Sequence, residues 1–219
     1  LGRVRELQEI INADEVLSIG AGVSYTDALE TISNLAPDFG EMMRRIGAGQ
    51  VRNAGTIGGN IANGSPIGDT PPALIVLGAE LVLRKGDARR RLPIEAFFIE
   101  YGKQDRLPGE FLERIDIPLP GSAKTFKSYK ITKRFDQDIS AVCGCFAIEV
   151  TDGHVTSARI AFGGMAAVPA RAHGVEAALI GKPWTQDTCN VAVAEFANDF
   201  SPITDMRASA AYRMDVAGN

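Results

Sequence analysis

The chain has 219 residues, of which 45% are hydrophobic and 23% are charged, and its formal net charge is −4 at pH 7. This length and composition allow a well-buried core, either as one large domain or as two small ones. The acidic balance argues against a nucleic-acid-binding surface, which needs a basic face, and no apolar run approaches the roughly 20 residues that span a bilayer.

The first predicted elements are a strand, a glycine turn and a helix. Residues 16–19 form a short apolar run typical of a strand, and a helix is expected from about residue 26 to residue 35. Gly20 and Gly22 lie between them, which suggests a Rossmann unit. GAGVSY lacks the third glycine of GxGxxG, so this dinucleotide signal is weak, and a helix-packing turn explains both glycines equally well.

Residues 47–69, GAGQVRNAGTIGGNIANGSPIGD, hold seven of the 23 glycines and three asparagines. A backbone with so few side chains reaches positive φ and can lie directly against a flat or anionic ligand. Hydroxyl, amide and backbone N–H donors gather there with one carboxylate: Thr56, Gly58, Gly59, Asn60, Ser65 and Asp69. That mixture suits a cofactor with a polyol chain and a phosphate. A cluster of turns that reverses the chain twice explains the composition equally well.

The remaining pattern favours an α+β fold. A helix is expected to open at Pro71 and Pro72, and a hairpin is expected around Gly86. A second part is expected to begin near Gly121. The strands expected after residue 77 are 81–83, 89–92, 115–119, 126–132, 141–150 and 155–162, and the later helices are 170–180, 187–197 and 208–216. A tight Asp152-Gly153 turn is expected to join the last two strands, and Gly181 is expected to end the first of these helices. Antiparallel strands followed by helices indicate a sheet with helices packed on one face.

The cysteines and histidines predict no metal site. Cys143 and Cys145 alternate on one predicted strand and are expected in the core, while Cys189 lies in a later helix. An iron–sulfur cluster needs four thiolates, and neither His154 nor His173 has metal-ligand spacing around it. We identify no catalytic nucleophile, base or triad. Three cysteines cannot pair completely and no signal-peptide pattern opens the chain, so we expect a reducing cytoplasm.

Three segments resemble a known family. Residues 52–83, RNAGTIGGNIANGSPIGDTPPALIVLGAELVL, resemble the flavin-domain signature of the xanthine dehydrogenase and molybdenum hydroxylase family, with its TxGGN and GDxxP motifs. Residues 126–142, FKSYKITKRFDQDISAV, resemble the lysine-bearing strand and charged loop of the xanthine dehydrogenase branch. Residues 158–179, ARIAFGGMAAVPARAHGVEAAL, resemble the C-terminal part of the same flavoprotein domain.

The resemblance implies an α+β fold in two parts. Residues 1–120 would be the second FAD-binding subdomain of the PCMH, or vanillyl-alcohol-oxidase-like, type. Residues 121–219 would be an antiparallel sheet with helices, similar to the C-terminal domain of CO dehydrogenase flavoproteins. The family's N-terminal FAD subdomain, with its Gly-Gly-Thr loop, has no counterpart before Leu1, so the chain resembles a fragment. The iron–sulfur and molybdopterin domains are expected on other segments or subunits.

The resemblance also implies which residues contact FAD. They are Ile46, Thr56, Ile57, Gly58, Gly59, Asn60, Ser65, Asp69, Leu112 and Lys130. Ile46 stands where animal relatives carry an aromatic residue, which puts its contact in doubt, and Leu112 could equally be a core leucine. Lys130 would place a cation near the N1–C2 edge of the flavin and stabilise its anionic reduced form; an ordinary solvated strand lysine is the alternative. Residues 133–138 resemble the segment that borders the NAD site.

The implied function is electron transfer within a xanthine dehydrogenase. In the family, xanthine or hypoxanthine is hydroxylated at molybdenum, electrons cross [2Fe-2S] clusters to FAD, and hydride passes to NAD as co-substrate. The expected partners are an iron–sulfur segment and a molybdopterin-binding subunit in a hetero-oligomer, without nucleic acid or membrane. The alternatives are a flavin subunit of the carbon monoxide dehydrogenase or aryl-CoA reductase type, a docking module without FAD, and a Rossmann oxidoreductase.

Overall fold

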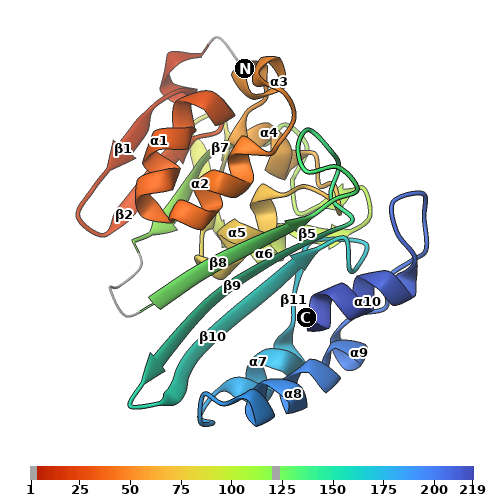
Figure 1. Ribbon diagram of the computed structural model, residues 1–219. Helices are drawn as coiled ribbons and strands as arrows, with labels where there is room; N and C mark the ends of the chain where they lie inside the picture. Colours follow the sequence, from red (N-terminus) through yellow and green to blue (C-terminus); the bar gives the residue numbers. More distant parts are fainter. Residues whose placement is uncertain (1–3, 120–123) are drawn as a thin grey trace.

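Two antiparallel sheets organise the computed structural model, which describes residues 4–119 and 124–219 (Figure 1). The larger sheet has the strand order β1-β2-β7-β3-β4. Its strands are β1 (Ile10–Asn12), β2 (Val16–Gly20), β3 (Glu80–Lys85), β4 (Ala88–Pro93) and β7 (Phe111–Pro118). Every pairing in this sheet is antiparallel, which excludes the parallel sheet of a Rossmann unit. The expected hairpin joins β3 to β4, with Gly86 at a φ of 59°.

The helices of the first part cover this sheet and connect its strands. They are a 3₁₀ turn η1 (Arg5–Leu7), α1 (Tyr25–Leu35), α2 (Pro37–Arg44), α3 (Gly49–Ala54), α4 (Ile57–Ala62), α5 (Thr70–Val76) and α6 (Ile94–Phe97). The helix expected over 26–35 is α1, and the Ser24 side chain caps it by accepting from the Asp27 N–H at 3.0 Å. Of the helices in the described residues, none is long and apolar enough to cross a membrane.

The glycine segment is more regular than its composition suggests. Two short helices, α3 and α4, lie where we considered a cluster of turns. The Thr56 side chain caps α4 by accepting from the Gly59 N–H at 2.9 Å, and Gly64, at a φ of 62°, follows its end. A side-chain cap satisfies one of the free N–H groups of a first turn, which offsets part of the cost of glycine in a helix.

The second sheet has the strand order β11-β10-β9-β8. The strands expected here are observed, and β9 and β10 meet at the predicted turn, where Asp152 and Gly153 both have positive φ. The bounds are β8 (Lys124–Ile131), β9 (Val142–Thr151), β10 (His154–Gly163) and β11 (Ala170–Arg171), and a separate small hairpin joins β5 (Phe98–Glu100) to β6 (Lys103–Gln104). The start of the second part that we expected near Gly121 lies outside the described residues.

Two of the later helices differ from expectation. The helix expected over 170–180 begins only at His173, because Ala170 and Arg171 pair with β10 as β11. The helix expected over 187–197 divides at Glu195 into two helices. The bounds are α7 (His173–Leu179), α8 (Gln186–Ala194), α9 (Phe196–Asp199) and α10 (Ala210–Gly218). Gly181, at a φ of 78°, follows α7 as predicted.

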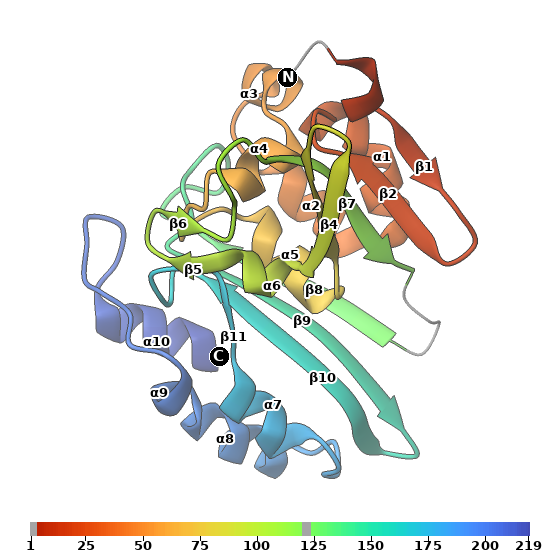
Figure 2. The same cartoon turned by 180° about the vertical axis from the view of Figure 1, so that it is seen from behind.

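The four-stranded sheet separates two hydrophobic cores. Successive side chains of each strand point to opposite faces of this sheet. Cys143 and Cys145 therefore face the core shared with the first part, whereas Val142 and Phe162 face the core beneath α7 to α10. Helix α5 packs against β9 and β10 on the first of these faces (Figure 2). The core position predicted for the two cysteines is confirmed. The first core therefore takes side chains from both parts of the chain.

Phe162 organises the second core. Its ring makes edge contacts with Phe146, Phe196 and Phe200 at centroid distances of 5.7, 5.3 and 5.6 Å. Edge-to-face pairs of this kind stabilise a core beyond the area that they bury. These contacts hold α9 and the segment after it against the sheet.

We therefore expect Phe162→Ala to lower the free energy of unfolding by about 3 to 5 kcal/mol, because the large ring leaves a cavity among three others. Urea unfolding followed by circular dichroism measures this change. Phe135→Ala is the control, because Phe135 is 79% exposed. Its ring contacts the Arg45 guanidinium, and its loss is expected to cost about 1 kcal/mol or less. Equal losses in the two variants would contradict the assignment.

Candidate functional site

The start of α4 is docked into the turn that follows β2. The Ile57 N–H donates to the Val23 carbonyl at 3.1 Å, and the Gly58 N–H donates to the Ala21 carbonyl at 3.2 Å. A Cβ atom at Gly58 would lie 2.4 Å from the Cβ atom of Ala21. Glycine at this position is therefore required by the chain's own packing. Most N–H groups in the first turn of α4 donate to acceptors within the protein.

Gly59 and Asn60 lie at the accessible side of the same helix. Gly59 is exposed, and among the described residues a Cβ atom there would meet only Thr56 Oγ1, at 2.9 Å. Asn60 Oδ1 accepts from Thr70 Oγ1 at 2.6 Å and from the Thr70 N–H at 3.3 Å. Its Nδ2 has no acceptor within residues 4–119 and 124–219, so two N–H donors remain for a ligand. The start of α4 therefore offers an open, polar surface next to a helix N-terminus.

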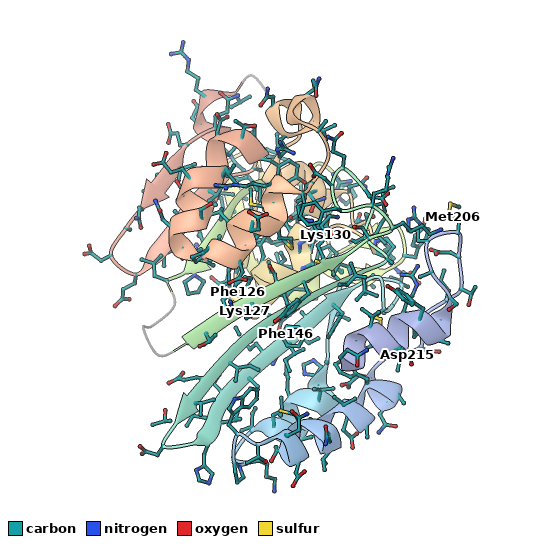
Figure 3. All side chains as sticks on the ribbon, viewed as in Figure 1. Phe126, Lys127, Lys130, Phe146, Met206 and Asp215 are labelled. Atoms are coloured by element: carbon teal, nitrogen blue, oxygen red, sulfur yellow. The ribbon has the colours of Figure 1, made fainter. Side chains whose placement is uncertain are left out.

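Asp69 and Lys130 form a buried ion pair, although the sequence suggested two separate roles for them. Lys130 Nζ lies 2.6 Å from Asp69 Oδ2, and the two side chains are 1% and 8% exposed. Asp69 precedes α5 of the first part and Lys130 lies on β8 of the second. Figure 3 shows Lys130 in the interior between the helices of the first part and β8. The solvated strand lysine that we considered as an alternative is therefore wrong.

Ser140 closes this cluster, and the sequence gave no sign of its involvement. Its Oγ donates to Asp69 Oδ1 at 2.5 Å and accepts from Lys130 Nζ at 2.7 Å. Ser140 is 1% exposed and lies on the segment between β8 and β9. We refer to Asp69, Lys130 and Ser140 as the interface cluster. The sequence offered one signal for Ser140, its position ten residues after Lys130. That spacing becomes informative only when the path of the chain between β8 and β9 is known.

Tyr25 is a second residue that sequence reasoning missed. It begins α1, its N–H donates to the Gly55 carbonyl at 3.0 Å, and its side chain is buried beside Gly55. Burial, together with the negative charge of Asp69, raises the pKa of the phenol above its ordinary value. Tyr25 therefore lies against the glycine segment and is close enough to the interface cluster for the charge of Asp69 to act on its phenol, which stays protonated.

The other predicted residues lie around this centre in different environments. Ile57 and Leu112 are buried in the first core, and Ile46 packs against it. Ser65 lies in the turn after α4, where its Oγ accepts from the Ile67 N–H at 3.3 Å. The core alternative for Leu112 agrees with its 4% exposure. Contact of any of these side chains with a cofactor stays a prediction.

The loop after β8 folds back on the first part. Arg45 Nε donates to the Phe135 carbonyl at 2.8 Å, and its guanidinium lies 4.8 Å from the centre of the Phe135 ring. Lys133 Nζ donates to the carbonyl of Met206, which lies in the loop before α10 (Figure 3). Phe135 is largely exposed. The first half of the loop thus has specific contacts with Arg45 and with Met206, and it carries an exposed aromatic ring.

Two family models match the chain. A model of the FAD binding domain in molybdopterin dehydrogenase matches residues 1–120, and a model of the CO dehydrogenase flavoprotein C-terminal domain matches residues 127–219. The glyceraldehyde dehydrogenase medium chain of Sulfolobus acidocaldarius is 31% identical over 218 residues, 99% of this chain and 77% of that protein. The xanthine dehydrogenase of Emericella nidulans is 31% identical over 199 residues, 84% of this chain but 14% of that protein.

The fold also matches a solved structure. Carbon monoxide dehydrogenase from Hydrogenophaga pseudoflava contains a chain that superposes with a TM-score of 0.93 at 29% identity, covering 100% of this chain and 76% of that one. This likeness confirms the α+β fold expected from the resemblance. The division of the chain at residue 120 stays a prediction, because it falls on residues outside the described ranges.

The residues at the start of α4 fit FAD. An exposed glycine leaves room for a large ligand beside the backbone of α4. The free Asn60 amide and the Lys130 ammonium, which uses two of its three N–H groups within the cluster, supply donors for oxygen atoms. The fit rests on the space at Gly59 and on these side-chain donors, because the N–H groups of residues 57–60 all have partners in the protein.

The burial of the ion pair generates a stability prediction. Lys130→Met leaves the Asp69 carboxylate buried without its cation, so we expect a loss of about 3 to 5 kcal/mol in the free energy of unfolding. The double variant Lys130→Met/Asp69→Asn removes both charges and should recover much of the loss. Lys127→Met is the control, because its ion pair with Asp38 is exposed and should cost about 1 kcal/mol or less. Chemical denaturation measures all three, and additive losses in the double variant would refute the pairing.

The raised pKa of Tyr25 generates a pH prediction. The unfolded phenol titrates near pH 10, and burial raises its folded pKa above that value. Stability from the neutral phenol is thus complete below about pH 10 and is lost as the pH rises above it. Tyr25→Phe should therefore lose less stability than the parent between about pH 9 and pH 11. Tyr101→Phe is the control, because Tyr101 is 73% exposed, and its stability should change with pH as that of the parent does. Identical curves of unfolding free energy against pH for all three proteins would contradict the expectation.

Proposed function

This chain belongs to the FAD-binding domain family of the molybdenum hydroxylases, and from that premise we propose that it holds FAD as the electron-transfer station of such an enzyme. The observation that carries the proposal is the open polar surface at the start of α4, with exposed Gly59 and the free amide N–H groups of Asn60, whose Oδ1 accepts from Thr70, the residue after Asp69 of the buried ion pair. FAD, when bound, supplies electron uptake and hydride transfer to NAD.

In this proposal the chain's own residues position the cofactor. Gly59 lets the ligand approach the N-terminus of α4, and Thr56 keeps that first turn in place through its cap. Lys130 would direct its remaining N–H group at the flavin. Because Asp69 neutralises its charge, Lys130 would act mainly as a hydrogen-bond donor, and less as the free cation that the sequence suggested.

We propose that the electrons come from [2Fe-2S] clusters on an iron–sulfur segment, and that a molybdopterin-binding subunit oxidises the substrate. The similarity to medium chains, which extends over the full length of this chain, supports a hetero-oligomer. For the substrate we propose xanthine or hypoxanthine, with NAD as acceptor, because the Lys133 to Asp138 loop resembles the xanthine dehydrogenase branch. A cytoplasmic location stays a prediction.

Medium chains of aldehyde and carbon monoxide dehydrogenases support a second candidate. The Sulfolobus relative named for glyceraldehyde and the Hydrogenophaga relative named for carbon monoxide each span nearly the whole of this chain. The flavin role of this chain is the same in both candidates. Oxidation of xanthine, an aldehyde and carbon monoxide by the purified native assembly, with NAD and with artificial acceptors, distinguishes them.

The flavin role is tested with a variant that fills the approach to α4. Gly59→Leu introduces a side chain whose Cβ atom would lie 2.9 Å from Thr56 Oγ1, so the cap of α4 must shift locally, while the rest of the fold should persist and the affinity for FAD should fall at least tenfold. Flavin absorbance of the purified protein and FAD titration by fluorescence measure this loss. Gly49→Ala is the matched control, because a Cβ atom there has no neighbour within 4 Å among the described residues. A parent without flavin that still binds its partners would leave a docking module instead.

A further inference from the structure

The interface cluster has an arrangement of donors that depends on Ser140. A lysine ammonium carries three N–H donors, and a serine hydroxyl carries one O–H donor. The Ser140 hydroxyl donates a hydrogen bond to Asp69 Oδ1 at 2.5 Å. Its Oγ therefore accepts the hydrogen bond that Lys130 Nζ donates at 2.7 Å. Lys130 gives a second N–H to Asp69 Oδ2 at 2.6 Å. Its third N–H has no acceptor among residues 4–119 and 124–219.

The three contacts also prevent a different geometry. Lysine rotates freely about its last bond, and a carboxylate with two open oxygen atoms attracts two N–H groups of one ammonium. Ser140 occupies Asp69 Oδ1, so Lys130 meets only Oδ2 of that carboxylate. Without the hydroxyl, both carboxylate oxygens would compete for the ammonium. One N–H of Lys130 stays free in either geometry, so Ser140 determines the direction in which the ammonium, and with it this free N–H, is held.

Stability alone does not account for this arrangement. A buried ion pair contributes little net stability, because the cost of removing both charges from water offsets their attraction. Lys130, Asp69 and Ser140 are each at least nine-tenths buried, and Thr70, the residue after Asp69, donates to Asn60 Oδ1 on α4. A donor that is buried, charged and incompletely partnered points to a ligand.

We propose that Ser140 is a positioning residue for the cofactor, which holds the Lys130 ammonium so that its free N–H is presented to the flavin. The inference rests on the proposed function of the chain. Ser140 acts through Lys130 and Asp69, without contact to the reacting atoms. By sharing the negative charge of Asp69, its hydroxyl also leaves more of the Lys130 charge available to stabilise reduced flavin.

The test compares Ser140→Ala with the parent in the native assembly, with the flavin midpoint potential as readout. We expect the affinity for reduced FAD to fall about tenfold relative to that for oxidised FAD, which lowers the potential of the two-electron couple by about 30 mV. Spectroelectrochemical titration at flavin wavelengths measures this shift. Ser140→Thr, which keeps a hydroxyl, should restore the parent potential.

Ser128→Ala is the matched control. Its hydroxyl donates to the Asp38 carbonyl at 2.9 Å, so it also joins β8 to the first part, but it does not contact the cluster. It should lower the melting temperature without moving the potential. If Ser140→Ala does not fold, Ser140→Cys fills the site with a slightly larger thiol, weakens both hydrogen bonds and should give a shift in the same direction.

The outcomes separate the inference from the proposed function. A parent that never retains FAD overturns both. A parent that retains FAD, with Ser140→Ala or Ser140→Cys folded at the parent potential, overturns the role of Ser140 alone. A shift in Ser140→Ala that Ser128→Ala reproduces also overturns it, because any lost hydrogen bond at this interface would then have the same effect.

Discussion

A buried ion pair joins the two parts of the fold, between Lys130 on β8 and Asp69 at the start of α5. Removing two charges from water is costly, so the pair persists only where its remaining hydrogen-bonding groups find partners. Ser140 supplies one hydrogen-bonding partner for this ion pair. Side chains from both parts of the chain, including Cys143 and Cys145, build the apolar core around the pair. This arrangement fixes β8 against the first part, and with it every element that follows.

The ion pair also changes the electrostatic role assigned to Lys130. A free lysine beside a flavin would act through its full positive charge, but Asp69 neutralises most of that field at close range. What remains is a charged hydrogen-bond donor with a direction, held in a dry environment where such a donor is strong. Tyr25 experiences the same carboxylate, since Asp69 helps to keep its phenol protonated. Asp69 thus contacts Lys130 on one side and adds to the effect of burial on the pKa of Tyr25 on the other.

The glycine segment serves two purposes that its sequence does not distinguish. Gly58 is needed because α4 touches the Ala21 turn, so its lack of a side chain is used within the protein. Gly59, the next residue, leaves the surface open and is free for a ligand. Adjacent positions in a helix point in different directions, so one motif can pack a helix and expose its N-terminus at the same time.

The sequence by itself determined the local structure and the family. The sequence predicted the strands β9 and β10 and their Asp152-Gly153 turn, and the TxGGN segment identified the flavin-domain family. It did not reveal that residues 47–69 form helices, because capping by Thr56 and docking against Ala21 outweigh the glycine content. Only the tertiary structure decided that Lys130 and Asp69, 61 residues apart, pair with each other and with Ser140. Such contacts come from the packing of whole elements, which no local pattern of residues encodes.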